Sequence, residues 1–443
     1  MTSSSLAPAP DARRAGDQGA AATHLRAVLG VLDAHHLDVA LVRDPGRDGA
    51  GRLEADLLVR PSQRDAVELL LAAEGFRRRP GWGRQPHRFH LRPVTDPGHD
   101  QLDWLKVDLV TDLCYGPVHE LSTGAADACL DARIREPFGA RRLQPADELM
   151  ALLLHGLLDR DQLRLDQRGA LAALATPGLE PGVLAHHLFG DAVDRRWQEL
   201  LSAIQEGDWG TVLAARPQLR VELRDGRRIA STLRGFRNRT ARRLAKPLTA
   251  VAARGALVAL VGPDGTGKST LAGTIGDAVG LPTRVLYGGT HPAGTHTSRV
   301  PGATTARITL RLLATRALIA WHRGRGRLVV LDRHPLQVRP RAGSTLSARA
   351  RARRRFLSIT LPRPDLLLVL DAPASVLHRR RPEHTVEQLE TARGLHVVLA
   401  VTRDRARILD ATATPARVLH DAVQLIWSDA LAPASVRRTG ARS

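Results

Sequence analysis

The C-terminal half of the chain alternates short, wholly apolar runs with longer segments whose apolar residues recur at helical spacing. The apolar runs predict buried strands at residues 256–261, 283–287, 327–331, 365–370 and 406–410. The segments between them predict helices at residues 268–279, 304–322, 374–380, 385–401 and 415–429. Strands that are apolar throughout and separated by helices are typical of a parallel sheet covered by helices on both faces. We therefore expect an α/β domain over residues 255–430.

The N-terminal half follows a less regular pattern. Its apolar spacing predicts helices at residues 23–36 and 63–75, and further helices within 145–176. Runs of strand character lie at residues 38–42, 53–59, 87–94 and 104–110. This order predicts a smaller, mixed α/β domain with a helical extension over residues 21–220.

Three segments lie outside these two domains. Residues 1–20 are rich in Ser, Ala, Pro and Gly and predict a disordered tail, and the polar residues 431–443 predict a frayed end. Residues 221–254 crowd many arginines into one helical stretch closed by Pro247, which predicts a basic linker helix. An electrostatic anchor on lipid or nucleic acid is the alternative for this stretch.

Composition adds constraints on size and partners. A chain of 443 residues is too long for one ordinary core, so two or three domains are expected. The formal net charge of +20 favours anionic partners such as nucleotides, nucleic acid or an anionic membrane surface. Aromatic residues make up only 3% of the chain, so the stacking platforms of single-strand binders are scarce and nucleic acid is not favoured.

The sequence also bears on the compartment. No apolar run approaches the ~20 residues that a membrane span needs, and the first ten residues lack the charged and apolar regions of a signal peptide. The two cysteines, Cys114 and Cys129, cannot build a disulfide framework. We expect a soluble protein without a membrane span in the reducing cytoplasm.

The strongest motif follows the first apolar run of the C-terminal half. The segment from Gly262 to Ser269 reads Gly-Pro-Asp-Gly-Thr-Gly-Lys-Ser and fits the phosphate-binding loop between a strand and a helix. Its glycines let backbone N–H groups converge on phosphate oxygens, and Ser269 would hold Mg²⁺. Lys268 is one of only three lysines among 65 Lys and Arg, and we expect it to be a solvated ligand for the β- and γ-phosphates. The expected nucleotide-binding residues here are Gly262, Asp264, Gly265, Thr266, Gly267, Lys268, Ser269 and Thr270.

Charged residues follow two more strands of the same half. Asp332 and Arg333 end one strand, and ligands bind at the carboxyl ends of parallel strands, so both should face the loop. Asp332 can hold Mg²⁺ and Arg333 can clamp a phosphate, while a surface salt bridge is the alternative. Arg380 and Arg381 lie in an arginine-rich segment that can stabilise migrating charge, or be a solvated basic loop.

Carboxylates gather on two strand candidates of the N-terminal half. Glu54 and Asp56 alternate along one strand and so share a face, and Asp108 lies on a neighbouring strand candidate. Three converging carboxylates suit the two Mg²⁺ ions of nucleotidyl transfer. Exposed acids on amphipathic strands are the alternative reading of the same residues.

The C-terminal motifs together resemble the thymidylate kinase family of P-loop nucleoside monophosphate kinases over roughly residues 255–429. The resemblance implies that Asp264 approaches the acceptor sugar and that Arg333, in Asp332-Arg333-His334, binds the acceptor phosphate. It also implies that the lid begins near Arg380 and Arg381. The loop after Ile408-Leu-Asp410 would lie against the adenine, so Asp410 joins the expected nucleotide-binding residues.

This sequence departs from that family in its acceptor pocket. The middle helices offer only Trp321 and Phe356 as aromatics, and His334 stands where an aromatic residue is usual. Residues 22–175 resemble a nucleotidyltransferase-like domain of the minimal polymerase-β type. There the Gly-Ser turn is absent and the first acid is Glu54, so the domain could be degenerate, ligand-binding or inactive.

We therefore expect an enzyme, a kinase that uses ATP and Mg²⁺ to phosphorylate a nucleoside monophosphate or a similar small phosphorylated acceptor. Its expected catalytic residues are Lys268, Asp332, Arg333, Arg380 and Arg381. Two other classes stay open: a nucleic-acid-binding or polynucleotide-end-modifying P-loop protein, and a non-catalytic ATP switch. A homodimer also stays open, and the identity of the acceptor is not fixed by the sequence.

Overall fold

The computed structural model describes residues 19–431, apart from 49–50, 79–85, 97–98, 136–139, 161, most of 225–254, 290–302 and most of 336–355. The chain divides into two compact units, residues 1–94 with 103–246 and residues 95–102 with 247–443. The expected disordered tail, frayed end and most of the expected basic linker lie outside the described residues. Residues 221–224 of that expected linker belong to a packed helix, α9.

The N-terminal unit is built on a mixed sheet with the strand order β4-β5-β6-β3-β1-β10-β9, in which β2 also pairs with β3. Its long central strands β3 and β6 run parallel, and β1 is antiparallel to β3. The strands are β1 (Val39–Leu41), β2 (Gly46–Arg47), β3 (Leu53–Val59), β4 (Arg77–Arg78), β5 (His87–Asp96), β6 (His99–Val110), β9 (Ile134–Arg135) and β10 (Arg141–Arg142). A separate ribbon pairs β7 (Cys114–Tyr115) with β8 (Leu121–Ser122).

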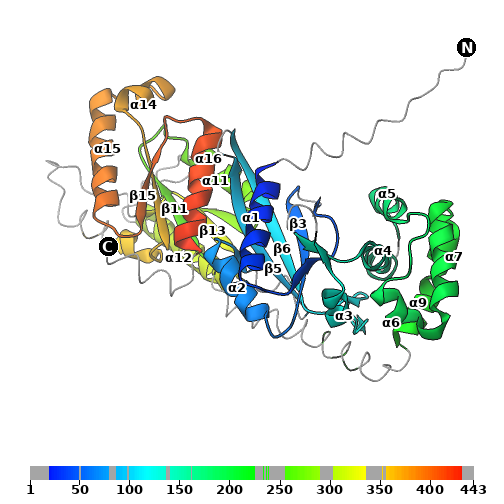
Figure 1. Ribbon diagram of the computed structural model, residues 1–443. Helices are drawn as coiled ribbons and strands as arrows, with labels where there is room; N and C mark the ends of the chain where they lie inside the picture. The colour runs from blue at the N-terminus through cyan, green and yellow to red at the C-terminus, as the bar shows by residue number, and fades with distance from the viewer. Residues whose placement is uncertain are drawn as a thin grey trace, which may run out of the picture. The chain divides into compact units, whose positions relative to one another are not determined.

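Both faces of this sheet are buried because apolar side chains alternate between two cores. Val39 and Leu57 pack with α1 and α2 in one core, while their neighbours Ala40 and Leu58 join the core formed by the later helices. Figure 1 shows α1 and α2 beside the sheet and the later helices gathered as a separate cluster. The helices are α1 (Ala20–Ala34), α2 (Arg64–Ala73), α3 (Ala126–Asp131), α4 (Pro145–Leu154), the π-helix η3 (His155–Asp159), α5 (Leu165–Leu174), α6 (Val183–Phe189), the 3₁₀-helix η4 (Gly190–Ala192), α7 (Val193–Gln205), α8 (Trp209–Ala214) and α9 (Arg216–Arg224).

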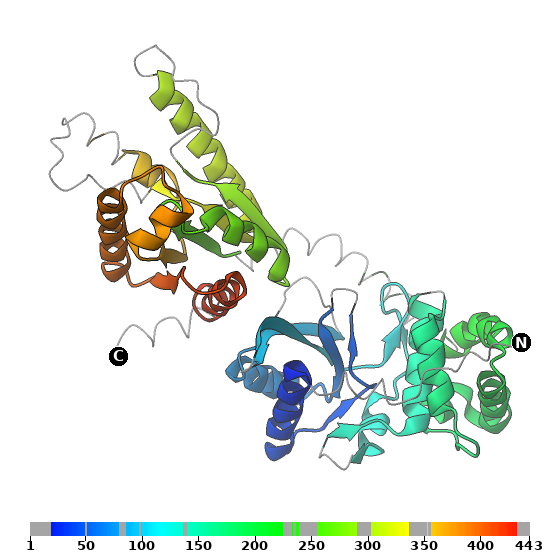
Figure 2. The same ribbon diagram turned by 90° about the horizontal axis from the view of Figure 1, so that it is seen from above.

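The C-terminal unit contains a five-stranded parallel sheet with the order β12-β13-β11-β14-β15. Figure 2 shows this unit from above, with helices around its sheet. Its strands lie within one residue of the predicted positions: β11 (Leu257–Val261), β12 (Thr283–Tyr287), β13 (Leu328–Asp332), β14 (Leu366–Asp371) and β15 (Ala406–Asp410). The three central strands are buried except at their last residues, Asp332 and Asp371. The predicted α/β class, with a parallel sheet in one unit and a mixed sheet in the other, is confirmed. The mixed unit was expected to be the smaller one, but it is the larger of the two.

Helices cover both faces of the parallel sheet. Leu257, Ala259 and Val261 share a core with α12 and α15. The alternate residues of β11 face the other side, where α11 and α16 pack together. The helices are α11 (Lys268–Ala278), α12 (Ala303–Gly324), α14 (Ala374–Arg380), α15 (Val386–Val401), α16 (Pro415–Leu425) and the π-helix η6 (Ile426–Ala430).

The strand order places a crevice at the end of β11. Strand β11 is the first strand of its sheet in sequence, yet it lies between β13 and β14. Chain connections therefore leave in opposite directions on its two sides, which opens a binding crevice at the carboxyl ends of the strands. The loop after β11, with the ends of β13 and β14, borders this crevice.

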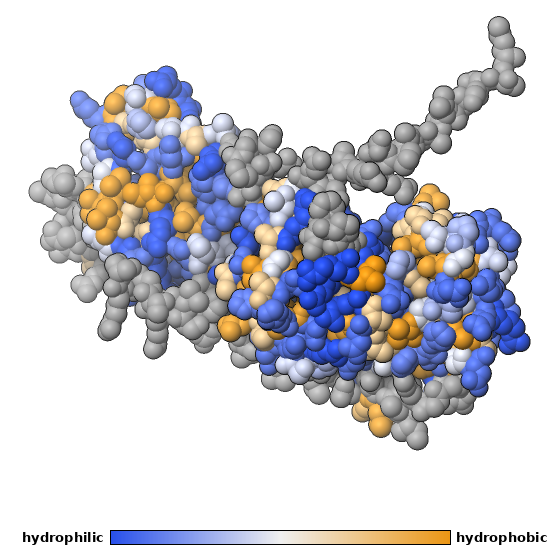
Figure 3. Space-filling model, in the orientation of Figure 1, coloured by the Kyte–Doolittle hydropathy of each residue, from blue (hydrophilic) through white to orange (hydrophobic). Residues whose placement is uncertain are grey.

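The surface of the C-terminal unit carries an apolar area near α15 and β15 (Figure 3), where the exposed large residues are Val386, Val398, Val401 and Ile408. Among the described helices, none combines the length and the apolar character that crossing a membrane requires.

Candidate nucleotide-binding site

The loop after β11 has the backbone that a phosphate cradle needs. Gly262 has a φ of 150°, and a Cβ there would lie 2.5 Å from the carbonyl oxygen of Leu370, so any larger residue would collide with β14. Gly267 adopts the left-handed conformation, with a φ of 84°, as the residue that caps the N-terminus of α11. The first turn of α11 leaves its backbone N–H groups free for an anion at the positive end of the helix dipole.

Lys268 lies inside this loop, and the expectation of a solvated lysine is wrong. Its side chain is only 4% exposed, and Nζ donates to the carbonyl oxygen of Pro263 over 2.6 Å. Burial lowers the pKa of Lys268 to about 8, and the nearby Arg333 and Arg381 add to this shift while Asp264 and Asp332 oppose it. Burial thus outweighs the nearby carboxylates, and an incoming phosphate would add negative charge beside the ammonium.

Ser269 and Asp332 meet at the carboxyl end of β13. Strands β11 and β13 pair with Leu260 opposite Asp332, and the Ser269 hydroxyl donates to Oδ2 of Asp332 over 2.7 Å. The second oxygen, Oδ1 of Asp332, is buried without a hydrogen-bond partner among the described residues. A hydroxyl and an incompletely satisfied carboxylate beside a phosphate cradle fit the oxygen ligands that Mg²⁺ prefers. Thr270 follows on the exposed side of α11.

Asp264 and Arg333 form an ion pair across the crevice. Nη2 of Arg333 donates to Oδ1 of Asp264 over 3.0 Å, and the same oxygen lies 3.8 Å from Nζ of Lys268. His384 Nε2 is 3.8 Å from the other oxygen, so one carboxylate lies among three nitrogen-bearing groups. Arg333 also has a φ of 71°, an uncommon conformation for a residue with a Cβ, and such backbone strain clusters at functional sites.

The two arginines of the expected lid lie in different surroundings. The positive charge of Arg381 contributes to the lowered pKa of Lys268, and its Cβ lies 3.8 Å from where a Cβ on Gly265 would be. Arg380 instead donates to the carbonyl oxygen of Ala411, in the loop after β15, over 2.9 Å. Arg381 is therefore the one that borders the phosphate loop, while Arg380 ties α14 to the loop expected near the adenine.

Asp410 ends β15 next to Asp371, its partner in the parallel register. Its carboxylate accepts hydrogen bonds from the backbone and the hydroxyl of Thr412 over 2.8 and 2.6 Å, and these bonds lower the pKa of Asp410. Asp410 thus shapes the loop after the last strand from an exposed position.

Sequence reasoning missed two residues of α15. Arg393 binds both oxygens of Asp371 over 2.8 and 3.1 Å, which joins α15 to the end of β14. Burial lowers the pKa of His396, and Lys268 and Asp264 are among the charges that act on it. Neither residue belongs to a local motif, so only the packing of α15 against β14 reveals them.

His334, the departure from the family pattern, is a structural residue. It is buried, and its Nε2 lies 3.2 Å from the carbonyl oxygen of Pro362. Burial lowers the pKa of His334 to about 4, so the ring is neutral near pH 7. It therefore adds no charge to the crevice.

The three acids of the N-terminal unit are each bound to a different basic group. The register of β3 and β6 places Asp56 opposite Asp108 and Glu54 opposite Lys106, and Glu54 is bound by Lys106. Arg43 Nε donates to Asp56 over 2.6 Å, and His87 Nδ1 lies 2.7 Å from Oδ2 of the buried Asp108. The pair Asp56 and Asp108 is therefore brought together, while Glu54 is neutralised separately.

The described geometry lends no support to a metal centre built from all three acids. Within the part of the chain that the structure describes, no group of three or more His, Cys, Asp and Glu side chains is placed to hold a metal ion. Burial raises the pKa of Asp108, while the imidazole of His87 opposes this shift. The expected three-carboxylate site gains no support from this geometry.

Comparisons with known proteins add little. No family model matches the sequence, and no curated protein matches it. Among solved structures, a thymidylate kinase from Candida albicans shows a weak similarity: it is 16% identical over 41% of this chain and 94% of its own, with a TM-score of 0.32. A similarity this weak carries no conclusion about activity.

Proposed function

We propose that the C-terminal unit is an ATP- and Mg²⁺-dependent phosphotransferase whose acceptor is a nucleoside monophosphate or a similar small phosphorylated molecule. The observation that carries this proposal is the 2.7 Å hydrogen bond between Ser269 and Asp332 beside the buried ammonium of Lys268. Phosphoryl transfer needs positioned cations and phosphate ligands more than it needs covalent chemistry. This crevice concentrates such groups at the edge of one sheet.

On the donor side, the loop amides and Lys268 hold the β- and γ-phosphates, and Thr270 lies in the same first turn of α11. Ser269 and Asp332 hold Mg²⁺, which when bound neutralises charge on the phosphate oxygens. The donor phosphates add negative charge beside the buried Lys268, so their binding raises its proton affinity.

On the acceptor side, Arg333 binds the phosphate of the acceptor. When Arg333 binds this phosphate, its ion pair with Asp264 is broken and the Asp264 carboxylate can bind the acceptor instead. The 3.0 Å ion pair supports this proposal because it places both side chains next to each other. Arg381, which borders the phosphate loop, stabilises the migrating phosphoryl charge. Arg380 orders the loop after β15.

Arg333 follows β13 and lies beside the phosphate loop, which binds the donor phosphates. A second phosphate-binding group outside this loop suits an acceptor that itself carries a phosphate. The nucleotidyltransferase likeness of the N-terminal unit stays a prediction, with Asp56 and Asp108 as its remaining metal-ligand candidates.

An acceptor screen tests the proposal. The full-length protein is incubated with Mg²⁺ and γ-labelled ATP together with nucleosides, nucleoside monophosphates or sugar phosphates, and label transfer is measured. We expect transfer to a phosphorylated acceptor and none by Lys268→Ala. Transfer to polynucleotide ends would favour the nucleic-acid alternative, and ATP binding with no transfer to any acceptor would favour the switch.

A further inference from the structure

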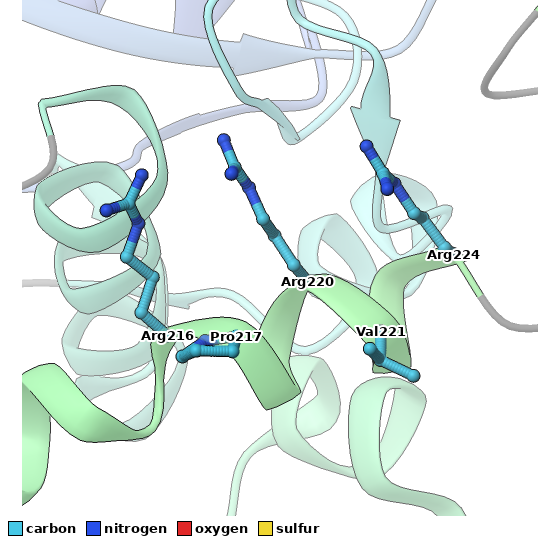
Figure 4. Close-up of a pocket in the computed structure, with 5 residues that line it drawn as sticks. All are labelled: Arg216, Pro217, Arg220, Val221 and Arg224. Carbon is cyan, nitrogen blue, oxygen red and sulfur yellow. The ribbon is translucent and has the colours of Figure 1, made fainter.

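A row of arginines lines a cavity on α9 of the N-terminal unit. Arg216, Arg220 and Arg224 are four residues apart along α9, so their side chains share one face of the helix. With Pro217 and Val221 they line a cavity of about 340 Å³. Figure 4 shows the three side chains extending from the same side of the helix.

Two of these arginines lack an anionic partner. Within the described part of the chain, neither Arg220 nor Arg224 forms an ion pair, and Nε of Arg220 is buried without a hydrogen-bond partner. Some other arginines of the unit do have a carboxylate partner, such as Arg43 with Asp56 and Arg47 with Asp103. A buried donor that lacks an acceptor is costly, and an unseen ion or ligand commonly explains it.

The helix holds the row in place and keeps its own acid away from it. Leu219 and Leu223 are buried in the helical core, so an adjoining face of α9 is fixed. Glu222 is the sole carboxylate of α9, and it accepts a hydrogen bond from Arg196 of α7 over 3.4 Å. Since Glu222 is two residues from both Arg220 and Arg224, it lies on another side of the helix.

We propose that this cavity binds a small anion with at least two linked phosphoryl groups. Guanidinium groups only donate hydrogen bonds and fit the geometry of phosphate oxygens, so a row of them selects an acceptor-rich anion. Neighbouring members of the row are about one helical turn apart, ~5.4 Å, so a single phosphoryl group does not engage all of them. A polyphosphate chain spans the row, whether it is inorganic or carried by a nucleotide.

A small ligand fits the cavity better than a nucleic-acid strand. The residues that line the cavity include no aromatic side chain on which bases could stack. The cations also belong to one compact cavity on a single helix instead of a long groove.

Titration of tripolyphosphate and ATP into the full-length Lys268→Ala protein tests this site apart from the phosphate loop. The comparison variant adds Arg220→Gln and Arg224→Gln, and the matched control instead adds Arg26→Gln and Arg195→Gln, which remove the same charge from other helices. We expect the row variant to weaken tripolyphosphate binding by at least about tenfold, because charge-assisted hydrogen bonds are lost. The control should change affinity by less than about twofold, as expected for screened surface charge.

The two ligands distinguish the source of the phosphates. Equal affinity for ATP and tripolyphosphate supports an inorganic chain, and tighter ATP binding supports a nucleotide. Arg220→Lys with Arg224→Lys keeps the charge without the planar fork, so it should weaken binding while preserving the thermal transition. The proposal would be overturned if the Arg220→Gln, Arg224→Gln variant and the control variant lost equal affinity for tripolyphosphate. It would also be overturned if neither ligand bound saturably, or if only a 20-mer oligonucleotide bound.

Discussion

Ser269 Oγ donates a hydrogen bond to Asp332 Oδ2 over 2.7 Å, which joins the first turn of α11 to the end of β13. The two residues are 63 positions apart, yet the parallel pairing of β11 with β13 fixes both at the same sheet edge. Asp332 Oδ1 is left buried without a hydrogen-bond partner among the described residues. The pair is thus arranged to share a ligand, which we propose to be Mg²⁺.

Ser269→Ala and Asp332→Asn should each raise the Mg²⁺ concentration needed for half-maximal phosphotransfer by about 10- to 100-fold. The double variant should lose less than the sum of the two single effects, because both residues act on one ion. Initial rates measured against Mg²⁺ concentration provide the comparison. Additive effects would show that the two residues act independently and would contradict a shared site.

Lys268 predicts a pH dependence of ATP binding. Its folded pKa of about 8 means that the free protein loses this charge above pH 8, and ATP binds the charged form. The affinity should therefore fall about tenfold for each unit of pH above 8. Isothermal titration from pH 7 to pH 9.5 measures this, and Lys268→Arg, which stays charged, should bind less tightly but without the slope. A flat profile for the wild type would contradict the buried-lysine account.

The same pKa predicts the opposite trend for stability without ligand. The folded value of about 8 lies below the ordinary value of 10.5, so between these limits the unfolded chain binds more protons than the folded one. The contribution of Lys268 to the free energy of unfolding should rise with pH across this window. Urea unfolding of the wild type and of Lys268→Met measures this contribution. The difference between their free energies of unfolding should change over pH 8 to 10.5, and a constant difference would refute the lowered pKa of Lys268.

Much of the C-terminal unit could be predicted from the sequence because its signals are local. Wholly apolar runs fixed the five strands within one residue, and the glycines before Lys268 marked the loop. The pairing of Asp264 with Arg333 and of Arg393 with Asp371 could not be predicted, because it depends on how separate loops and helices pack. The burial of Lys268 was missed for the same reason.

In the N-terminal unit, the alternation of polar and apolar residues correctly placed Glu54 and Asp56 on one face of β3. It gave no information on the register between β3 and β6. The pairing of β3 with β6 sets Lys106 opposite Glu54 and thereby neutralises one expected metal ligand. Strands of two residues, such as β9 and β10, have too few positions to show a period, and the sequence reading missed them.

Arg333→Ala should raise the acceptor KM by at least about tenfold, because a charge-assisted contact to phosphate is lost. ATP affinity should change by less than twofold (~0.4 kcal/mol). Arg333→Gly should raise the acceptor KM as much as Arg333→Ala does. It should melt at a higher temperature than Arg333→Ala, since a φ of 71° costs an alanine about 1 kcal/mol. Steady-state kinetics and thermal melting measure both effects. Equal losses of ATP and acceptor affinity would place Arg333 on the donor side.

Gly262→Ala should destabilise the C-terminal unit by about 1–3 kcal/mol and abolish ATP binding, because the new Cβ would lie 2.5 Å from the Leu370 carbonyl oxygen. Gly273→Ala is the matched control, since an added Cβ there meets nothing within 4 Å. It should stabilise α11 by about 0.5–1 kcal/mol. Denaturant melts of both variants give these differences. If Gly262→Ala melts like the wild type, the close approach of the loop to β14 is wrong.

The central claim is that the γ-phosphoryl group of ATP moves onto a phosphate that the acceptor already carries. Phosphorus NMR of a reaction with Mg²⁺, ATP and a nucleoside monophosphate tests it most directly, because the signals of a phosphoanhydride and a phosphate ester differ. We predict that ADP and a nucleoside diphosphate, with a new phosphoanhydride signal, form together in equal amounts. ADP with only inorganic phosphate, or with a new phosphate ester, would contradict the account.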